Sequence, residues 1–366
     1  MTRVLTLDEK RALYRDGYVV AKAAVAPRIV DAALDRIARA EKGEYLGYEP
    51  EMTDLINQSE LTPILRDAIG DFDPPSACQM GLIKRSEPDE TFNAFGYRTC
   101  DMPYYNAQIH IDGMLTMFDG PQVHEIQQGT PEEIYARYMT RGPKGDLGRS
   151  ADVIGGNFTP LFQDPEMTLA LGSFTSFVFV ALSDQTMEGY GQTNVFPGGH
   201  HAMQTFLREQ RSINNHLGPE GPGWARLDHD APNRCGLVYV PPTVEAQFID
   251  DTSDTTPDGR RWPRPTPIFM EPGDALIATY QIPHSGSMNV NGTESRKTMV
   301  FRIRNKKRQP DVVVTGMSDH PDRGWLGEWL DFEPGNDPWE RSKHAMCNIW
   351  DEWEGLQDVV TEAATE

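Results

Sequence analysis

The stretch Gln108-Ile109-His110-Ile111-Asp112 constrains the fold of this chain more than any other part of the sequence. Apolar isoleucines flank the histidine, and short apolar runs precede the stretch, so we expect it to lie on a β-strand. Residues two positions apart on a strand point to the same side. His110 and Asp112 would therefore direct one nitrogen and one oxygen towards a common point.

The best third ligand lies far downstream, in Ile282-Pro283-His284-Ser285-Gly286. His284 follows an apolar strand expected over residues 275–280. Two histidines and a carboxylate on one face, with the remaining positions open, describe the facial triad of non-haem Fe(II) oxygenases. The sequence thus predicts His110, Asp112 and His284 as catalytic metal ligands. A His-x-Asp triplet alone is a weak signal, because a buried histidine beside a carboxylate is more often structural.

Arg296 begins the next expected strand and is the candidate partner for a co-substrate. Many iron oxygenases of this type need an electron-rich co-substrate, and 2-oxoglutarate has a distal carboxylate that suits the planar fork of arginine. Thr298 shares a strand face with Arg296 and adds a hydroxyl. Gln108 shares the face of His110 and is expected to contact co-substrate or substrate. Two further arginines on the Arg296 face, Arg302 and Arg304, are alternative clamps.

Composition excludes several classes of function. The net charge of −21 repels phosphate backbones, so nucleic acid is not an expected partner. The sequence lacks the run of about 18 apolar residues that a membrane span needs, and its first ten residues do not resemble a signal peptide. We therefore expect a cytoplasmic protein with no membrane partner. The four cysteines are scattered, which disfavours a disulfide framework or a zinc ribbon.

Short strands separated by Gly/Pro turns, with helices gathered at the start, predict a mainly β fold: a sandwich or barrel core with flanking helices. Thr6 and Glu9 form a capping-box pattern at the first helix. Further elements are expected as a strand at 17–20, a helix near Pro27, and a short helix with Thr62 as its N-cap that ends at Gly70. A buried strand is expected within 168–182, an apolar strand over 275–280 and a final strand over 297–303.

Four segments in this order resemble the phytanoyl-CoA dioxygenase family of Fe(II)/2-oxoglutarate-dependent oxygenases, over roughly residues 5–305. They are Leu7-Asp8-Glu9 with Asp16-Gly17-Tyr18-Val19-Val20, then His110-Ile111-Asp112, then Asn194 to His200, and His284-Ser285-Gly286-Ser287-Met288-Asn289 with Arg296. The resemblance implies a double-stranded β-helix (jelly-roll, cupin-like) core. It also implies that His110, Asp112 and His284 bind iron and that Arg296 holds the co-substrate.

Two departures from the family pattern concern the pocket. The long interval between Asp112 and His284 implies insertions near 119–165 and 202–265, and Gly199 stands where the family has serine. We expect a dioxygenase domain over residues 1–305 and a Trp-rich extension over 306–366. The extension is expected to pack on the core or on a partner subunit, which makes a homodimer a possibility. His200 and His201 are expected at a turn, where a capping or surface role is favoured over a position facing the pocket mouth.

The resemblance implies a dioxygenase that uses O2 and 2-oxoglutarate, releases succinate and CO2, and hydroxylates or otherwise oxidises a small organic metabolite. The related halogenases lack the carboxylate at the position of Asp112, so its presence favours hydroxylation or another oxidation. The alternative is a cupin-type metal- or ligand-binding protein that is non-catalytic or independent of 2-oxoglutarate. That alternative predicts that Arg296 is dispensable.

Overall fold

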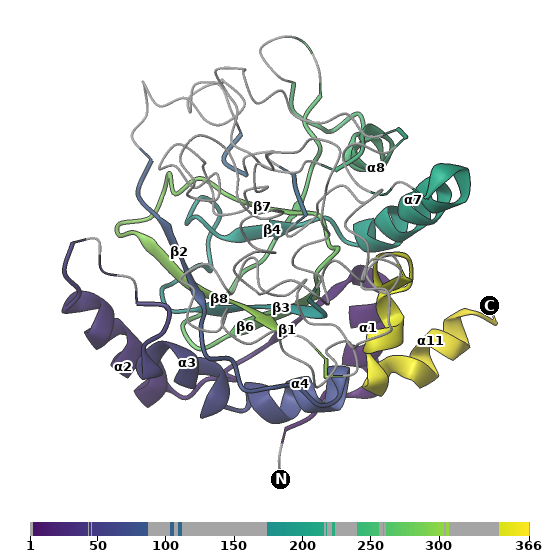
Figure 1. The fold of residues 1–366 in the computed structure, drawn as a ribbon. Coiled ribbons are helices and arrows are strands. Elements are labelled where there is room, and N and C mark those ends of the chain that lie inside the picture. The colour runs from purple at the N-terminus through teal and green to yellow at the C-terminus, as the bar shows by residue number, and fades with distance from the viewer. Residues whose placement is uncertain are drawn as a thin grey trace, which may run out of the picture.

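The structure is a computed structural model that describes residues 3–42, 44, 46–86, 103–105, 109–111, 174–215, 217, 222–223, 240–255, 259, 261–303, 305–306 and 344–365. Two antiparallel sheets and flanking helices make up this part of the chain, in agreement with the mainly β prediction (Figure 1). The strands are β1 (Tyr18–Ala21), β2 (Gln79–Ile83), β3 (Ser176–Ala181), β4 (Thr193–Val195), β5 (Thr266–Pro267), β6 (Ala275–Thr279), β7 (His284–Gly286) and β8 (Arg296–Ile303).

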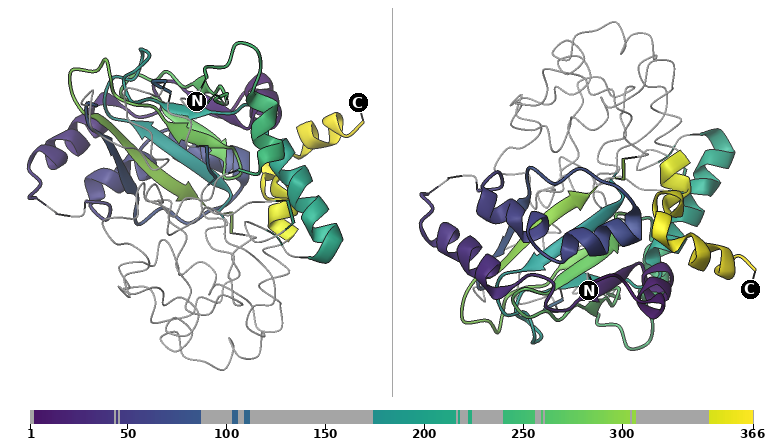
Figure 2. Two further views of the ribbon diagram at one scale, coloured as in Figure 1. Left: turned by 90° about the horizontal axis from the view of Figure 1, so that it is seen from above. Right: turned by 90° about the horizontal axis from the view of Figure 1, so that it is seen from below.

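The larger sheet has the strand order β1-β6-β3-β8-β2, and the smaller has the order β5-β4-β7. In the larger sheet, β6 and β3 are buried along their whole length, as their continuous apolar sequences predict. Three helices cover one face of this sheet: α2 (Pro27–Ala38), α3 (Pro50–Asn57) and α4 (Leu61–Ile69) (Figures 1 and 2). The smaller sheet lies on its other side.

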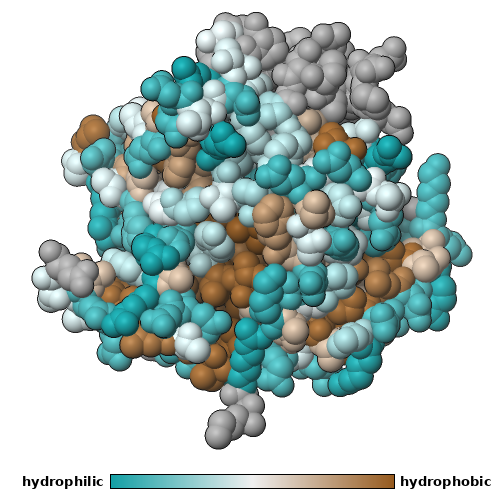
Figure 3. All heavy atoms as spheres, turned by 180° about the vertical axis from the view of Figure 1, so that it is seen from behind, coloured by the Kyte–Doolittle hydropathy of each residue, from teal (hydrophilic) through white to brown (hydrophobic). Residues whose placement is uncertain are grey.

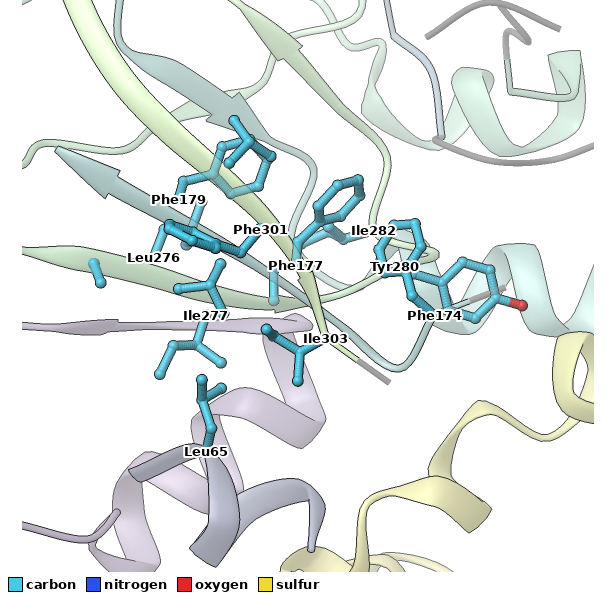
Figure 4. Close-up of a cluster of buried hydrophobic side chains, with 14 of the residues drawn as sticks. Leu65, Phe174, Phe177, Phe179, Leu276, Ile277, Tyr280, Ile282, Phe301 and Ile303 are labelled. Atoms are coloured by element: carbon cyan, nitrogen blue, oxygen red, sulfur yellow. The ribbon is translucent and has the colours of Figure 1, made fainter. Parts of the chain in front are cut away.

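The core between the helices and the larger sheet is built from alternate strand residues. Leu65 of α4 points towards Ile277 and Ile303, while Phe177 and Phe179 project from the opposite face (Figure 4). The alternation follows from the two-residue period of a strand. The larger sheet therefore has one face towards the helices and one towards the smaller sheet.

Of the two helix caps predicted from the sequence, Thr6 is confirmed and Thr62 is wrong. Thr6 caps α1 (Leu7–Asp16): the Glu9 amide donates to the Thr6 hydroxyl at 3.2 Å, and the Thr6 amide donates to the Glu9 carboxylate at 2.8 Å. The prediction that Thr62 caps the next helix is wrong, because α4 begins at Leu61. The Thr62 hydroxyl instead donates to the carbonyl of Ile56 at the end of α3, at 2.7 Å.

Helices also occupy part of the region predicted as the second insertion. They are α7 (Gly199–Asn214), α8 (Pro242–Glu245) and the 3-10 turn η3 (Ala246–Phe248). The predicted insertion at 119–165 lies outside the described residues. Two of the four cysteines are described, Cys78 and Cys347, and both are free thiols.

The end of the chain packs on the same core as the sheets. It consists of η5 (Ile349–Glu352), η6 (Glu354–Leu356) and α11 (Gln357–Ala363). Trp350 and Trp353 are buried in the main hydrophobic cluster together with residues of β3 and β8. Asn305 ties this segment to the sheet by donating to the Glu352 carbonyl and the Glu354 carboxylate, at 3.2 and 3.0 Å.

Hydrophilic side chains cover much of the face shown in Figure 3, with apolar patches between them. Within the described part of the chain, no helix has both the length and the apolar character that crossing a membrane requires. A homodimer remains a prediction, as does the division of the chain near residue 305.

Candidate metal and carboxylate site

The structure brings His110 and His284 together from sequence positions far apart. Their backbones form an antiparallel bridge in which each amide donates to the carbonyl of the other residue, at 3.0 Å in both directions. Directly opposed residues of such a bridge point to the same face. The ring centroids are 4.5 Å apart, and the side chains are only 8% and 6% exposed. Two buried imidazoles are thus held side by side by backbone pairing.

The hydrogen bond of His284 determines which of its ring nitrogens carries a hydrogen. Its Nδ1 atom lies 3.0 Å from the carbonyl oxygen of Ile282. Because a carbonyl can only accept, Nδ1 carries the hydrogen, and Nε2 keeps its lone pair. This arrangement is the usual one for a metal-binding histidine, whose second nitrogen donates to a carbonyl or carboxylate that fixes the ring.

Aromatic side chains of the larger sheet close one side of this pair. The ring centroids of Phe177 and Phe179 lie 5.3 and 5.9 Å from that of His284, both in edge-to-face geometry. Both phenylalanines are buried. The histidine pair therefore lies between the two sheets against an apolar wall, where a bound metal would be shielded from bulk water on that side.

Arg296 is a buried cation at the start of β8. It is 6% exposed, and no carboxylate forms an ion pair with it among the described residues. Burial lowers the pKa of its guanidinium to about 10, so the group stays charged near neutral pH. A buried charge is costly unless it is paired, and this one has only neutral partners within the described part of the chain.

Three neutral oxygens orient the Arg296 guanidinium. Nε donates to the Gly191 carbonyl at 2.8 Å, Nη1 to the Gly81 carbonyl at 3.1 Å, and Nη2 to the Thr193 hydroxyl at 3.1 Å. A guanidinium has five N–H donors. One hydrogen on each terminal nitrogen therefore has no acceptor among the described residues. Two such hydrogens match the two oxygens of a carboxylate.

Strand β4 connects the arginine with the histidine pair. Val195 pairs with His284 and Thr193 with Gly286, so Thr193 lies on the same sheet face as the His284 side chain. Two residues along a strand span about 7 Å. Gly286 has no side chain, and a β-carbon there would lie 3.2 Å from the Ile83 side chain, which packs at this position. The Thr193–Arg296 contact therefore lies two residues along β4 from Val195, the residue paired with His284.

The other predicted site residues fall into two groups. Gln108, Asp112 and the alternative clamp Arg304 lie outside the described residues. Thr298 is buried, and its hydroxyl accepts from the Gln185 amide at 3.1 Å. Arg302 lies over the rings of Phe174 and Phe177, at 5.7 and 5.5 Å from their centroids. No group of three metal-binding side chains occurs in the described ranges, which do not include Asp112.

Sequence reasoning did not identify Thr193, nor the carbonyls of Gly81, Gly191 and Ile282. Backbone carbonyls have no signature in sequence, because every residue has one. Thr193 lies in an unremarkable run, Gly191-Gln192-Thr193-Asn194, and only strand pairing places it between the histidines and the arginine.

His200 and His201 lie at the start of α7, and the expected surface role of His200 is wrong. His200 is fully buried, and the Nε2 atoms of both histidines lie 2.9 Å from the Tyr14 carbonyl. A β-carbon at Gly17 would overlap the His200 ring. Burial lowers the pKa of His200 to about 3 and also lowers that of His201. This pair joins α1 to α7 and is not part of the candidate site.

The depressed pKa of His200 predicts a loss of stability in acid. The unfolded chain binds a proton on this histidine near its ordinary pKa of 6.5, whereas the folded chain does so only near pH 3. Acidification between these values therefore favours unfolding, by about 1.4 kcal/mol per pKa unit at most. We expect the unfolding free energy of His200→Gln to fall less steeply from pH 6.5 to pH 4 than that of the wild type, measured by urea titration. Parallel curves would contradict the assignment, and the exposed His344→Gln serves as control.

This chain resembles known proteins only distantly. No protein-family model and no curated protein matches the sequence. Among solved structures, HygX from Streptomyces hygroscopicus with iron bound matches at 13% identity and a TM-score of 0.38, over 82% of this chain and 87% of that chain. HygX with nickel, 2-oxoglutarate and hygromycin B matches at 14% and 0.36, over 82% and 87%. AviO1 from Streptomyces viridochromogenes Tue57 matches at 13% and 0.35, over 83% and 96%. Similarity at this level assigns neither a family nor a function to the chain.

Proposed function

We propose that this protein is an Fe(II)- and 2-oxoglutarate-dependent dioxygenase that hydroxylates or otherwise oxidises a small organic molecule. The observation that carries the proposal is the pairing, within one inter-sheet space, of two buried histidines with a buried arginine that has no acidic partner among the described residues. The proposal includes a double-stranded β-helix core, for which two facing antiparallel sheets are the expected framework.

The residues present fit an iron ion. His284 offers Nε2 with its lone pair, since Nδ1 is committed to Ile282, and the ring of His110 lies beside it. In the proposal, Asp112 supplies the carboxylate that completes the triad, two residues beyond His110 on the same strand face. Iron with 2-oxoglutarate and O2 would supply the oxidising power, with release of succinate and CO2.

The chain's own residues have three tasks in this proposal. The histidine pair orients two ligand nitrogens through backbone bonds that do not depend on side-chain torsions. Arg296 holds the distal carboxylate of the co-substrate with its two uncommitted N–H groups, and so orients its keto-acid end towards the histidines. Phe177 and Phe179 keep water away from that side of the metal.

The proposal is tested by anaerobic titration of the purified apo-protein with Fe(II) and 2-oxoglutarate. We expect a weak visible metal-to-ligand charge-transfer band. In Arg296→Met the half-saturating concentration of 2-oxoglutarate should rise about ten- to hundredfold, because hydrogen bonds to a charged group contribute about 1.5–3 kcal/mol. Absence of the band with iron demonstrably bound would favour a cupin-type metal protein that does not use 2-oxoglutarate.

Arg302→Met is the matched control for this titration. Arg302 lies on the same face of β8 as Arg296 but contacts Phe174, Phe177 and the Gln79 side chain. Its replacement should leave the half-saturating concentration of 2-oxoglutarate unchanged. The reverse result, a loss with Arg302→Met and none with Arg296→Met, would assign the clamp to Arg302.

A further inference from the structure

We propose that Thr193 is a binding residue for the co-substrate, and that its hydroxyl donates a hydrogen bond to the carboxylate held by Arg296. This inference rests on the proposed function, because it names a further part of the same site. It identifies a residue on β4, in the smaller sheet, whereas the sequence directed attention to Thr298 on β8.

The hydrogen-bonding capacity of the two groups carries the inference. Arginine only donates, so the Thr193 oxygen must accept from Nη2 of Arg296 in their 3.1 Å contact. The hydroxyl hydrogen of Thr193 then has to find another acceptor, and the described residues offer it none. Thr193 is only 2% exposed, so bulk water is not a ready substitute. A buried donor without an acceptor is costly, which indicates an acceptor that binds there.

The donors lie where one anion could accept them all. The Thr193 oxygen is in hydrogen-bond contact with Nη2, and each terminal nitrogen of Arg296 keeps one hydrogen without an acceptor among the described residues. Together they offer three donors at, or bonded to, the terminal nitrogens of one guanidinium. A carboxylate has about four lone-pair sites and can accept three hydrogen bonds. The chemical class of the ligand is therefore an acid whose carboxylate lies on the Arg296 side.

Thr298 differs from Thr193 in its partner. Its hydroxyl accepts from the side-chain amide of Gln185, a neutral group, at 3.1 Å. The Thr193 hydroxyl instead contacts the guanidinium that would hold the ligand. The two buried threonines thus form a matched pair for experiment.

Thr193→Val keeps the shape of the side chain and removes its hydroxyl. We expect the half-saturating concentration of 2-oxoglutarate in the anaerobic titration to rise about tenfold, since one hydrogen bond to a charged group is lost. Thr193→Ser should restore wild-type binding, and Thr298→Val should leave it unchanged. In turnover, KM for 2-oxoglutarate should rise while kcat at saturation stays near the wild-type value.

A second ligand separates an effect on the carboxylate from damage to the metal site. The probe is 2-oxobutyrate, which retains the keto-acid group and lacks the distal carboxylate. Wild type and Thr193→Val should bind it equally weakly. Weaker binding of 2-oxobutyrate by the variant would place the effect at the metal and overturn the inference.

The remaining outcomes distinguish the inference from the proposed function. Unchanged 2-oxoglutarate binding by Thr193→Val, with impaired binding by Arg296→Met, would reject Thr193 and leave the proposed function in place. No charge-transfer band in the wild type with iron bound would reject the proposed function itself. If Thr193→Val does not fold, Thr193→Ala supports the same comparison with Thr193→Ser.

Discussion

Replacement of His284 by alanine is expected to abolish iron binding and turnover. Loss of a residue that only orients a metal ligand costs about 10–100-fold in affinity or activity, so loss of a ligand should cost more than about a hundredfold. His110→Ala and Asp112→Ala are expected to have the same effect. Each would remove one of the three proposed protein ligands from a site that, in the proposal, leaves positions open for co-substrate and O2.

Iron content after anaerobic reconstitution and succinate formation measure this effect. His344→Ala is the control, because His344 is exposed, interacts with Asp351 and lies in the C-terminal segment. It should bind iron as the wild type does. Circular dichroism must show that the His284→Ala protein is folded, since His284 contacts Phe177 and Phe179. Full iron occupancy and activity in a folded His284→Ala protein would refute the metal site.

Gly355→Ala is expected to cause a large loss of stability. A β-carbon at this position would overlap the backbone carbonyl of Asp67 in α4, and neither backbone can move as a side chain does. The C-terminal segment would have to separate from α4, which would loosen the packing of the buried Trp353 and Leu356. Overpacking a core costs about 1–3 kcal/mol, and loss of a buried tryptophan about 3–5 kcal/mol, so we expect about 3 kcal/mol or more.

Urea unfolding followed by tryptophan fluorescence measures this loss. Gly259→Ala is the control, since a β-carbon there would have nothing within 4 Å. Its φ of +85° makes alanine unfavourable by about 1–2 kcal/mol for conformational reasons alone. The midpoint of Gly355→Ala should therefore lie below that of Gly259→Ala. A Gly355→Ala midpoint equal to the wild type would show that the C-terminal segment does not need this close contact.

Local sequence patterns predicted the elements that depend on neighbouring residues. The capping box at Thr6, the strand that begins at Tyr18, and the buried strands β3 and β6 all match the structure. Thr62 shows the limit of such patterns. It has the features of a helix cap, but the short connection from α3 to α4 lets its hydroxyl reach Ile56, so α4 begins earlier.

The candidate site also has one part that follows from the sequence and one part that follows only from the tertiary structure. The sequence by itself determined which residue types are available: histidines next to expected strands and an arginine at the start of β8. Only the tertiary structure decided that His110 and His284 pair through their backbones and that Arg296 is buried without an acidic partner among the described residues. The same holds for Thr193, which lies between them on β4. The physical reason is that strand register and burial arise from contacts between segments far apart in the chain, and no local pattern specifies which strand lies beside which.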